Sequence, residues 1–273
     1  MASNVNINFH QTFKPESSYI ASILEVSDGT CFGSVQEISS NTGIPQGTSS
    51  GKVEPHIQYA TFMGLITAEK GKDGYKLQRT NLGEVVYAED PGLQEELTLL
   101  LCHAMMCRNE NGAPLWNESF GKVIPRYNGS ISKDYLIEEL NQVYGGKVSS
   151  KNISPMLNAY TDMFEEIDIL HTDGNDIKTS EVKKNKEFKY LFAYILLALW
   201  DEKFADQDEI SSVQLEELNF GNIFGWGKKS EYEVLERLAE SNLLRLNRQL
   251  VPYTIYRQVS FDEIEGLLYS DLF

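Results

Sequence analysis

The chain has 273 residues with 41% hydrophobic content, enough to bury a substantial core as one large domain or as two to three small ones. Forty acidic against 24 basic residues give a formal net charge of −16, which opposes nonspecific binding to DNA or to anionic membranes, so any DNA contact must depend on local charge. Three cysteines, with no secretory leader expected before Phe9, argue against a disulfide framework and indicate a reducing cytoplasm.

The first predicted elements are two helices separated by a glycine. The stretch FGSVQEISSNTGI supplies a short helix that ends at Gly43, and SSGKVEPHIQYATFMGLI supplies a longer one. In the longer helix Val53 and Ile57 recur at helical spacing, Ser50 can cap the first turn, and Gly64 can end it. The pair therefore predicts a helix-turn-helix.

A basic hairpin is expected directly after these helices. The stretch LITAEKGKDGYKLQRT alternates short apolar runs about a Gly-containing polar tip, and it carries Lys70, Lys72 and Lys76 near its turn, which is typical of a hairpin. Helix, turn, helix and basic hairpin together describe a winged helix-turn-helix, a module that often lays its second helix in the DNA major groove. We therefore predict a DNA-binding module near the amino end.

An amphipathic helix and a loop are predicted after this module. LQEELTLLLCHAMMC places Leu97 and Met105 on one buried side of a helix. RNENGAPLWNESFGKVIPRYNGSIS is rich in turn residues, so we expect a loop that Trp116 and Phe120 attach to the core. Further along, the run FKYLFAYILLALW is too short to cross a bilayer and predicts a buried helix, so no membrane partner is expected.

The element order of the first module recurs twice. Residues 133–180 and 211–258 each show a short helix, a Gly-containing turn, a longer helix and an alternating strand pair. Because helical proteins commonly place a glycine between two helices, this simpler explanation stays open for the second and third units. The repeat interpretation gives an N-terminal winged-helix domain at 1–95, a helical linker with a second winged-helix-like unit at 96–186, and a C-terminal helical, winged-helix-like unit at 187–273. The predicted fold class is mainly α with small β wings, as tandem winged helix-turn-helix-like units.

Local charge favours the first and third units for contact with nucleic acid. Residues 52–79 hold five basic and three acidic side chains, and residues 228–257 hold six and four. Residues 147–184 hold five basic and seven acidic side chains. We therefore expect the middle unit to be a spacer.

The candidate DNA-binding residues lie on the first module. The loop GTSSGK lacks the spacing of a nucleotide-binding loop, but its hydroxyls and the free amides at the following helix start can hold a DNA phosphate; a simple helix cap is the alternative. Side chains near the start of the second helix are expected to face phosphates or base edges, as are the basic residues of the wing. The predicted set is Thr48, Ser49, Ser50, Lys52, His56, Gln58, Lys70, Lys72, Lys76 and Arg79.

Catalytic and metal chemistry are not expected. Cys102, His103 and Cys107 are close in sequence, but on a helix Cys102 and His103 point about 100° apart, and the chain has no second Cys-x-x-Cys to complete a zinc site. His10 has no nucleophile or carboxylate partner nearby in sequence. We therefore predict a non-enzymatic protein with no cofactor and no metal site.

Several short motifs occur together in one order and resemble a known family. They place His10, Thr12 and Phe13 in FHQTF, then Gly51, Lys52, Ile57 and Tyr59 in the longer helix, then His103, Trp116 and Phe120. Over residues 7–170 the chain resembles an uncharacterised bacterial domain-of-unknown-function family with a winged helix-turn-helix. The resemblance implies genes among phage-defence and DNA phosphorothioation-type clusters, often beside a reductase-like sulfur-transfer enzyme, and no established catalytic activity. The chain departs from the family at Pro55, Ala60 and Thr61.

Two functions are therefore expected to compete. The first is a non-enzymatic, cytoplasmic DNA-binding accessory or regulatory protein of a bacterial anti-phage defence system, with double-stranded DNA as its partner. The second is an adaptor or scaffold subunit of a defence complex that binds proteins encoded by neighbouring genes and not DNA. The net charge and the acidic residues between Asp201 and Glu217 favour the second.

Overall fold

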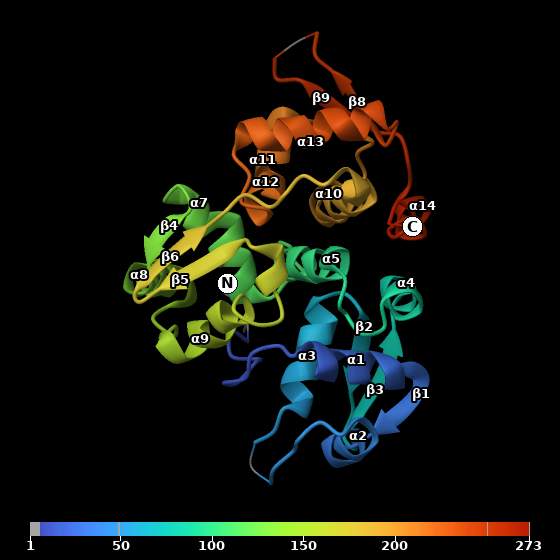
Figure 1. Cartoon of the computed structure of the whole chain (residues 1–273), viewed down its shortest axis with the longest axis vertical. Coiled ribbons are helices and arrows are strands. Elements are labelled where there is room, and N and C mark those ends of the chain that lie inside the picture. Colours follow the sequence, from blue (N-terminus) through green and yellow to red (C-terminus); the bar gives the residue numbers. More distant parts are fainter. Residues whose placement is uncertain (1–5, 49, 250, 273) are drawn as a thin grey trace.

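The computed structural model describes residues 6–48, 50–249 and 251–272 of the chain. Its elements are mainly α-helices, and its strands form three small antiparallel sheets of three strands each (Figure 1). The predicted mainly α fold with small β hairpins is confirmed. Ser49, one of the predicted DNA-binding residues, lies outside the described residues.

The first unit places a helix and a short strand before the predicted helix pair and hairpin. Its elements are α1 (Ser17–Val26), β1 (Asp28–Gly33), α2 (Val35–Thr42), α3 (Val53–Phe62), β2 (Ile66–Lys70) and β3 (Tyr75–Arg79). Strand β3 lies between β1 and β2 and pairs antiparallel with both. A capping box between Ser34 and Glu37 begins α2, and Gly43 follows its end with a φ of 72°.

The second and third units repeat this order of elements. The second contains β4 (Ser130–Ser132), α8 (Lys133–Tyr144), α9 (Ser150–Ala159), β5 (Leu170–Asp173) and β6 (Asp176–Thr179). The third contains α10 (Lys189–Phe204), β7 (Glu209–Ser211), α11 (Ser212–Leu218), α12 (Phe220–Ile223), α13 (Lys228–Glu240), β8 (Leu244–Asn247) and β9 (Thr254–Arg257), followed by α14 (Phe261–Glu265). In each sheet the last strand lies between the other two, so one topology occurs three times.

Helix α5 (Glu96–Met106), which follows α4 (Asn81–Glu89), lies between the units (Figure 1). It buries ten of its eleven residues, so the expectation of a single buried side is wrong. The reason is its central position, because α10 and the 3-10 helix η2 (Glu165–Ile167) both pack against it. Its His103 accepts a hydrogen bond from the Tyr160 hydroxyl (2.6 Å) at Nδ1 and donates one to the Ile223 carbonyl (2.9 Å) from Nε2. This side chain therefore connects α5 to the second and third units.

The stretch predicted as a turn-rich loop is largely helical. It contains α6 (Pro114–Trp116), the π-helix η1 (Asn117–Val123) and α7 (Ile124–Arg126). Pro114 can begin a helix because the first turn needs no donor from it. Burial of Trp116 and Phe120, which was predicted, provides the packing that overrides the turn-forming residues.

Helix α10 is the buried helix expected from the apolar run. Every residue from Leu191 to Trp200 is buried, and α13 and α14 pack against it. None of the helices in the described part of the chain combines the length and the hydrophobicity that spanning a bilayer requires.

Candidate nucleic-acid interface

Helix α3, the predicted DNA-reading helix, is largely covered. Six of its ten residues are buried, and the other four, Glu54, Gln58, Thr61 and Phe62, are half-buried. A helix that reads the major groove needs an open polar face. The structure therefore does not present α3 as the sequence suggested.

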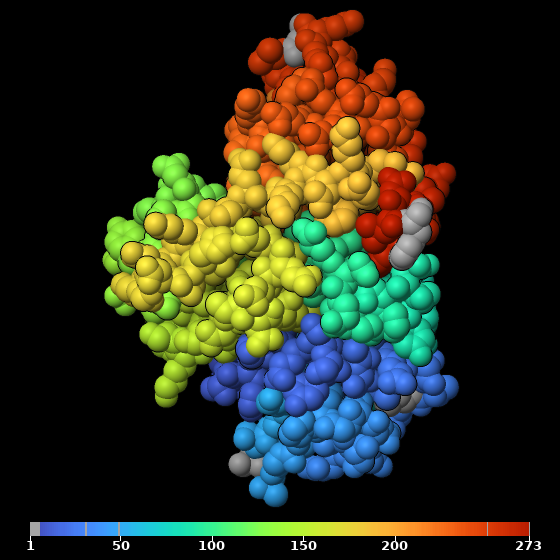
Figure 2. Space-filling model, in the orientation of Figure 1, coloured from blue at the N-terminus to red at the C-terminus, as the bar shows by residue number. Residues whose placement is uncertain are grey.

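The N-terminal segment, residues 6–16, covers one side of α3. The Tyr59 hydroxyl of α3 donates a hydrogen bond to the Phe13 carbonyl (2.9 Å). The Tyr59 ring also meets Phe9 and Trp116 edge to face, with centroid separations of 5.1 Å and 5.9 Å. In Figure 2 the N-terminal residues (dark blue) lie between the first unit (lighter blue) and the second unit (yellow-green). Phe9, Tyr59 and Trp116, which lie in the motifs that carry the family resemblance, thus form one aromatic cluster in the core.

His56 is buried and cannot face DNA, so the prediction that it binds DNA is corrected. Its side chain is fully buried, its Nδ1 lies 2.6 Å from the Lys52 carbonyl, and its ring meets Tyr19 edge to face. Burial lowers the pKa of His56 to about 4, so the ring carries no charge at neutral pH. The reason is the helical phase of α3, which turns position 56 toward α1.

The start of α3 also differs from expectation. Lys52, not Ser50, occupies the N-cap position, and no side chain caps the first turn. The Lys52 ammonium donates to Glu16 at 2.6 Å, which raises the pKa of Lys52 and keeps it charged. Thr48 and Ser50 are exposed on the preceding loop. Of the predicted loop residues, Lys52 is the one that the structure places in a defined setting.

The wing of the first unit is present, but two of its basic residues are already bound. Lys70 pairs with Glu54 at 2.7 Å, and the same carboxylate accepts a hydrogen bond from Tyr75 at 2.6 Å. Lys72 and Lys76 are exposed. The Lys70 side chain is itself 65% exposed, so the wing presents three exposed lysines, of which Lys70 is paired with Glu54 on α3.

The prediction that Arg79 binds DNA is also corrected. Its side chain is 11% exposed, and its Nη1 donates to the carbonyls of Leu24 (2.9 Å) and Glu25 (3.2 Å). Its guanidinium also lies 4.2 Å from the Tyr87 ring centroid. Arg79 therefore joins the sheet to α1 and is not available to a phosphate.

The structure instead places Lys52 in a groove between the first and second units. This groove has a volume of about 440 Å³. It is lined by Thr12, Phe13, Lys14, Glu16, Lys52, Lys151, Ser154, Pro155 and Asn158. Three lysines against one glutamate give it a local charge of +2 in a chain whose net charge is −16. A positive local charge of this kind attracts the negatively charged phosphates of DNA at short range.

Helix α9 forms the second-unit side of the groove and has an open polar face. Ser150, Lys151, Ser154 and Asn158 are all exposed, at spacings that place them along one side of the helix. Hydroxyl, amide and ammonium groups are those that contact DNA phosphates and base edges. The middle unit, expected to be a spacer, therefore carries a helix face of suitable chemistry for DNA.

Acidic residues are rare in the segments that line the groove, and Glu16 is the one acidic side chain in its described lining. Residues 1–15, 38–53 and 140–161 contain no Asp or Glu, although the chain contains 40. They contain Lys14, Lys52, Lys147 and Lys151. Counting charge over residues 147–184 concealed this, because the acidic residues of that range begin at Asp162. Acid-free runs were the sequence signal that could have identified Lys14 and Lys151.

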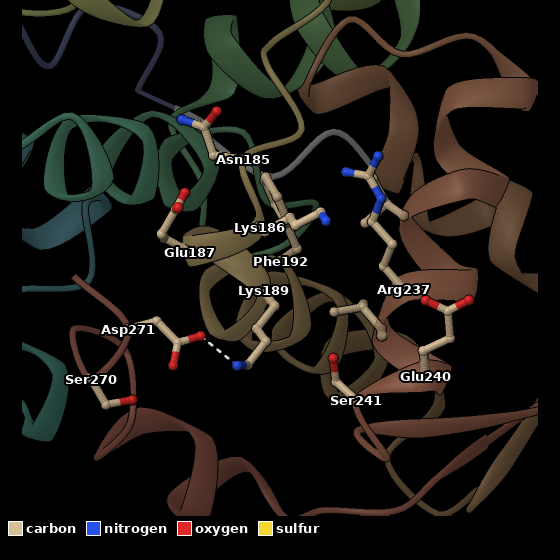
Figure 3. Close-up of a pocket in the computed structure, with 12 residues that line it drawn as sticks. Asn185, Lys186, Glu187, Lys189, Phe192, Arg237, Glu240, Ser241, Ser270 and Asp271 are labelled. Carbon is tan, nitrogen blue, oxygen red and sulfur yellow. Dashed lines mark ion pairs between the residues drawn. The ribbon is translucent and has the colours of Figure 1, made fainter. Parts of the chain in front are cut away.

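A second hollow, of about 550 Å³, lies between α10, α13 and the C-terminal residues (Figure 3). Its charged lining residues are Lys186, Lys189, Arg237, Glu187, Glu240 and Asp271. Lys189 and Asp271 form the ion pair drawn in Figure 3. Equal numbers of positive and negative side chains leave this hollow without the net charge that would attract a polyanion.

The remaining histidines and cysteines considered in the sequence lie in the core. Burial lowers the pKa of both His10 and His103 to about 4. Cys102 and Cys107 are buried free thiols, and burial raises the pKa of each. These groups therefore serve packing and the hydrogen bonds of the unit junction.

No protein-family model matches the chain, and no curated protein matches it. Two solved structures have a similar fold. A crystal structure of SspB aligns with a TM-score of 0.78 and 16% identity, and one of magnesium-ion-bound SspB aligns with 0.77 and 15%. Each alignment covers 97% of this chain and 88% of the SspB chain. At such low identity the likeness shows the fold alone.

Among the described residues, no group of three or more His, Cys, Asp or Glu side chains is arranged to hold a metal ion. No step of the function considered below involves a metal.

Proposed function

We propose that this chain is a non-enzymatic DNA-binding accessory or regulatory protein of a bacterial anti-phage defence system. It is cytoplasmic on this proposal, and it works with proteins encoded by neighbouring genes. The three units are tandem winged helix-turn-helix modules, and double-stranded DNA binds in the groove between the first and second. One observation carries the proposal: Lys14, Lys52 and Lys151 come together in the lining of this groove, where Glu16 is the one acidic residue in the described lining. The defence setting rests on the order of the sequence motifs.

In this arrangement α9, not α3, is the helix that meets DNA. Lys14, Lys52 and Lys151 contact phosphates and fix the position of the duplex, while Ser154 and Asn158 reach base edges. An Asn side chain can pair with adenine through two hydrogen bonds. The sequence preference of the protein therefore depends on α9, and its affinity depends on the lysines around it.

Two of the lysines must exchange their present partners for phosphates. Lys14 pairs with Asp162 and Lys52 with Glu16, and the lysine side chains are 36% and 28% exposed. Ion pairs exposed to this extent contribute about 0–1 kcal/mol each, so a phosphate can replace the carboxylate at small cost. Lys151 is exposed. The exchange makes binding strongly dependent on salt.

The acidic stretch that favoured an adaptor is largely engaged within the chain. Asp201 pairs with Arg257, and Glu202 lies 3.5 Å from Arg108. Further pairs join Glu216 to Lys228 and Glu217 to Lys203. Asp206, Asp208 and Glu209 of the same stretch are exposed, so internal pairing of the other four acidic residues reduces the support for the adaptor function but does not remove it.

The test is binding of a labelled random-sequence duplex by the full chain, measured by fluorescence anisotropy at several salt concentrations. The parent should bind with an affinity that falls steeply with salt. A triple variant with Lys14→Ala, Lys52→Ala and Lys151→Ala should bind more weakly and lose up to about 0.9 in the log–log salt slope for each lost phosphate contact.

A matched control removes the same number of charges elsewhere. Lys183→Ala, Lys186→Ala and Lys229→Ala change exposed lysines outside the groove and outside the first-unit wing, so this variant should keep most of the affinity and slope. Absence of binding by the parent, or equal losses in the two triple variants, would show that the groove is not the DNA site.

A further inference from the structure

A third hollow, of about 640 Å³, lies between the first and third units. On the first unit it is bordered by the end of α3, by β2 and by the start of α4. On the third unit it is bordered by α10 and α14, and the end of α5 lies between the two sides. Helices α4 and α14 pack against each other beside it (Figure 1). The hollow is therefore a junction of two units, like the groove at α9.

The charge of this hollow is opposite to that of the groove at α9. In its described lining, Arg108 stands against Glu110, Asp262 and Glu265, which gives a local charge of −2. Arg108 lies 3.5 Å from Glu202, which is not part of the lining. This acidic groove, defined by these four lining residues, repels DNA and attracts cationic groups.

Glu265 is the buried carboxylate of the acidic groove. It is 8% exposed, and among the described residues its carboxylate accepts one hydrogen bond, from the Tyr194 hydroxyl to Oε1 (3.1 Å). A carboxylate has about four acceptor sites. Burial raises the pKa of Glu265. A lysine or arginine side chain entering the groove can supply both the missing donors and the opposite charge.

Apolar side chains form the floor and sides of the acidic groove. Leu82 and Met105 are buried in its floor, and Phe62 and Phe261 are half-buried at its sides. An apolar side chain of a partner can cover the remaining exposed ring surface. The groove therefore suits a segment that carries both basic and apolar side chains.

Strand β2 brings an open sheet edge to the acidic groove. It is an edge strand, since β3 lies between it and β1. The Leu65 carbonyl accepts the Thr80 N–H (3.0 Å) across the pair with β3. Because hydrogen-bonded positions alternate along an antiparallel strand, the backbone N–H and C=O of Ala68 point away from β3. Ala68 is half-buried and lines the groove, so an extended segment can pair with this edge.

We propose that the acidic groove binds an extended basic segment of a partner protein. The segment adds to the edge of β2 as a further strand, packs an apolar side chain against Phe62, and brings a lysine or arginine to Glu265. The proposal extends the proposed function by giving a protein partner a docking surface. It does not depend on DNA binding, because the groove at α9 lies at a different junction.

The experiment measures binding of a fluorescein-labelled peptide of alternating Lys and Val to the full chain by fluorescence anisotropy. Two probes of equal charge accompany it. One is a block peptide with the same numbers of Lys and Val, and the other is the alternating peptide with N-methylated backbone amides. The parent should bind the alternating peptide at least about tenfold more tightly than either probe, since only this peptide combines strand pairing with alternating side chains.

A triple variant with Glu110→Gln, Asp262→Asn and Glu265→Gln removes the negative charge of the groove. It should bind the alternating peptide at least about tenfold more weakly, as expected when a hydrogen bond to a charged group is lost. If this variant does not fold, the exposed pair Glu110→Gln and Asp262→Asn should still weaken binding. The matched control removes three negative charges at exposed sites outside the groove, by Glu25→Gln, Glu138→Gln and Asp206→Asn. It should bind like the parent.

The proposal is overturned if the parent binds the three peptides equally or binds none of them, or if both triple variants lose the same affinity. A dimer of the parent in sedimentation that the alternating peptide dissociates would show that a second copy of the chain occupies the groove instead. Each of these results leaves DNA binding at the α9 groove standing, because duplex anisotropy measures it separately. Failure of duplex binding likewise leaves the peptide result standing.

Discussion

Helices α3 and α9 share one burial pattern but differ in what reaches solvent. In α3, positions 53, 55, 56, 57, 59 and 60 are buried, and the corresponding positions 153, 155, 156, 157, 159 and 160 are buried in and after α9. Both have a proline at the second of these positions, Pro55 and Pro155. The outward positions are half-buried in α3 and exposed in α9.

The surroundings of the two helices explain this difference. The outward Glu54 of α3 is held by Lys70 and Tyr75 of its own wing, and the N-terminal segment packs on Tyr59. In α9 the corresponding outward residue is Ser154, which is exposed and lines the groove. A repeated module can therefore serve as a structural support in one copy and as a binding surface in another.

The largest expected effect tests the contact between α3 and the N-terminal segment. Tyr59→Ala removes a buried ring and its hydrogen bond to Phe13, and it should lower the free energy of unfolding by about 3–5 kcal/mol in urea titrations. Tyr135→Ala on α8, where the side chain is 46% exposed, should cost less than about 1 kcal/mol. Similar losses for both would show that the segment does not hold α3.

The pH dependence of stability should report the same buried region. Burial lowers the pKa of His10, His56 and His103 from 6.5 to about 4. The unfolded chain then binds more protons between these values, so the free energy of unfolding is full above pH 6.5 and falls as the pH drops toward 4. Each histidine contributes on the order of 3 kcal/mol to this fall.

Urea titrations from pH 7.5 to 4.5 measure this fall. His56→Gln should flatten the curve, whereas His171→Gln, at a side chain that is 49% exposed, should leave its shape unchanged. A parent curve that is flat between pH 6.5 and 4.5 would contradict burial of the three neutral rings.

The smallest expected effect compares the two helices directly. Asn158→Asp on α9 and Gln58→Glu on α3 each replace an amide with a carboxylate at corresponding outward positions. Asn158→Asp should weaken duplex binding about tenfold, because it places a negative charge beside phosphate. Gln58→Glu should change it less than about twofold. Equal losses, measured by anisotropy, would remove the distinction between α3 and α9.

Local sequence patterns predicted much of the fold. The helix at α3, the lysine-bearing hairpin after it, the apolar helix α10 and the burial of Trp116 and Phe120 all match the structure. The prediction of a loop from Pro114 to Arg126 was wrong, because packing of its aromatic residues outweighs the turn propensity of Asn117 and Gly121. The N-cap predicted for α3 was also wrong, since Ser50 lies two residues before the N-cap position of a helix that begins at Val53.

The structure shows where the predicted DNA-binding residues lie. Lys52 lies in the groove, and Lys72 and Lys76 are exposed. His56 and Arg79 were misplaced, because a histidine or an arginine has the same appearance in sequence whether it faces solvent or a neighbouring helix. Lys14 and Lys151 were missed because they are 137 positions apart in the chain and meet only when the first two units pack together.

The sequence by itself determined the helices, the hairpins and the absence of acid from particular segments, because these depend on near neighbours and on composition. Only the tertiary structure decided which of the repeated helices stays open, since that depends on a segment far away in the chain. Burial of Tyr59 against Phe13 and exposure of Asn158 beside Lys14 are both outcomes of how the units pack. Chain folding thus turned similar helix patterns into different surfaces.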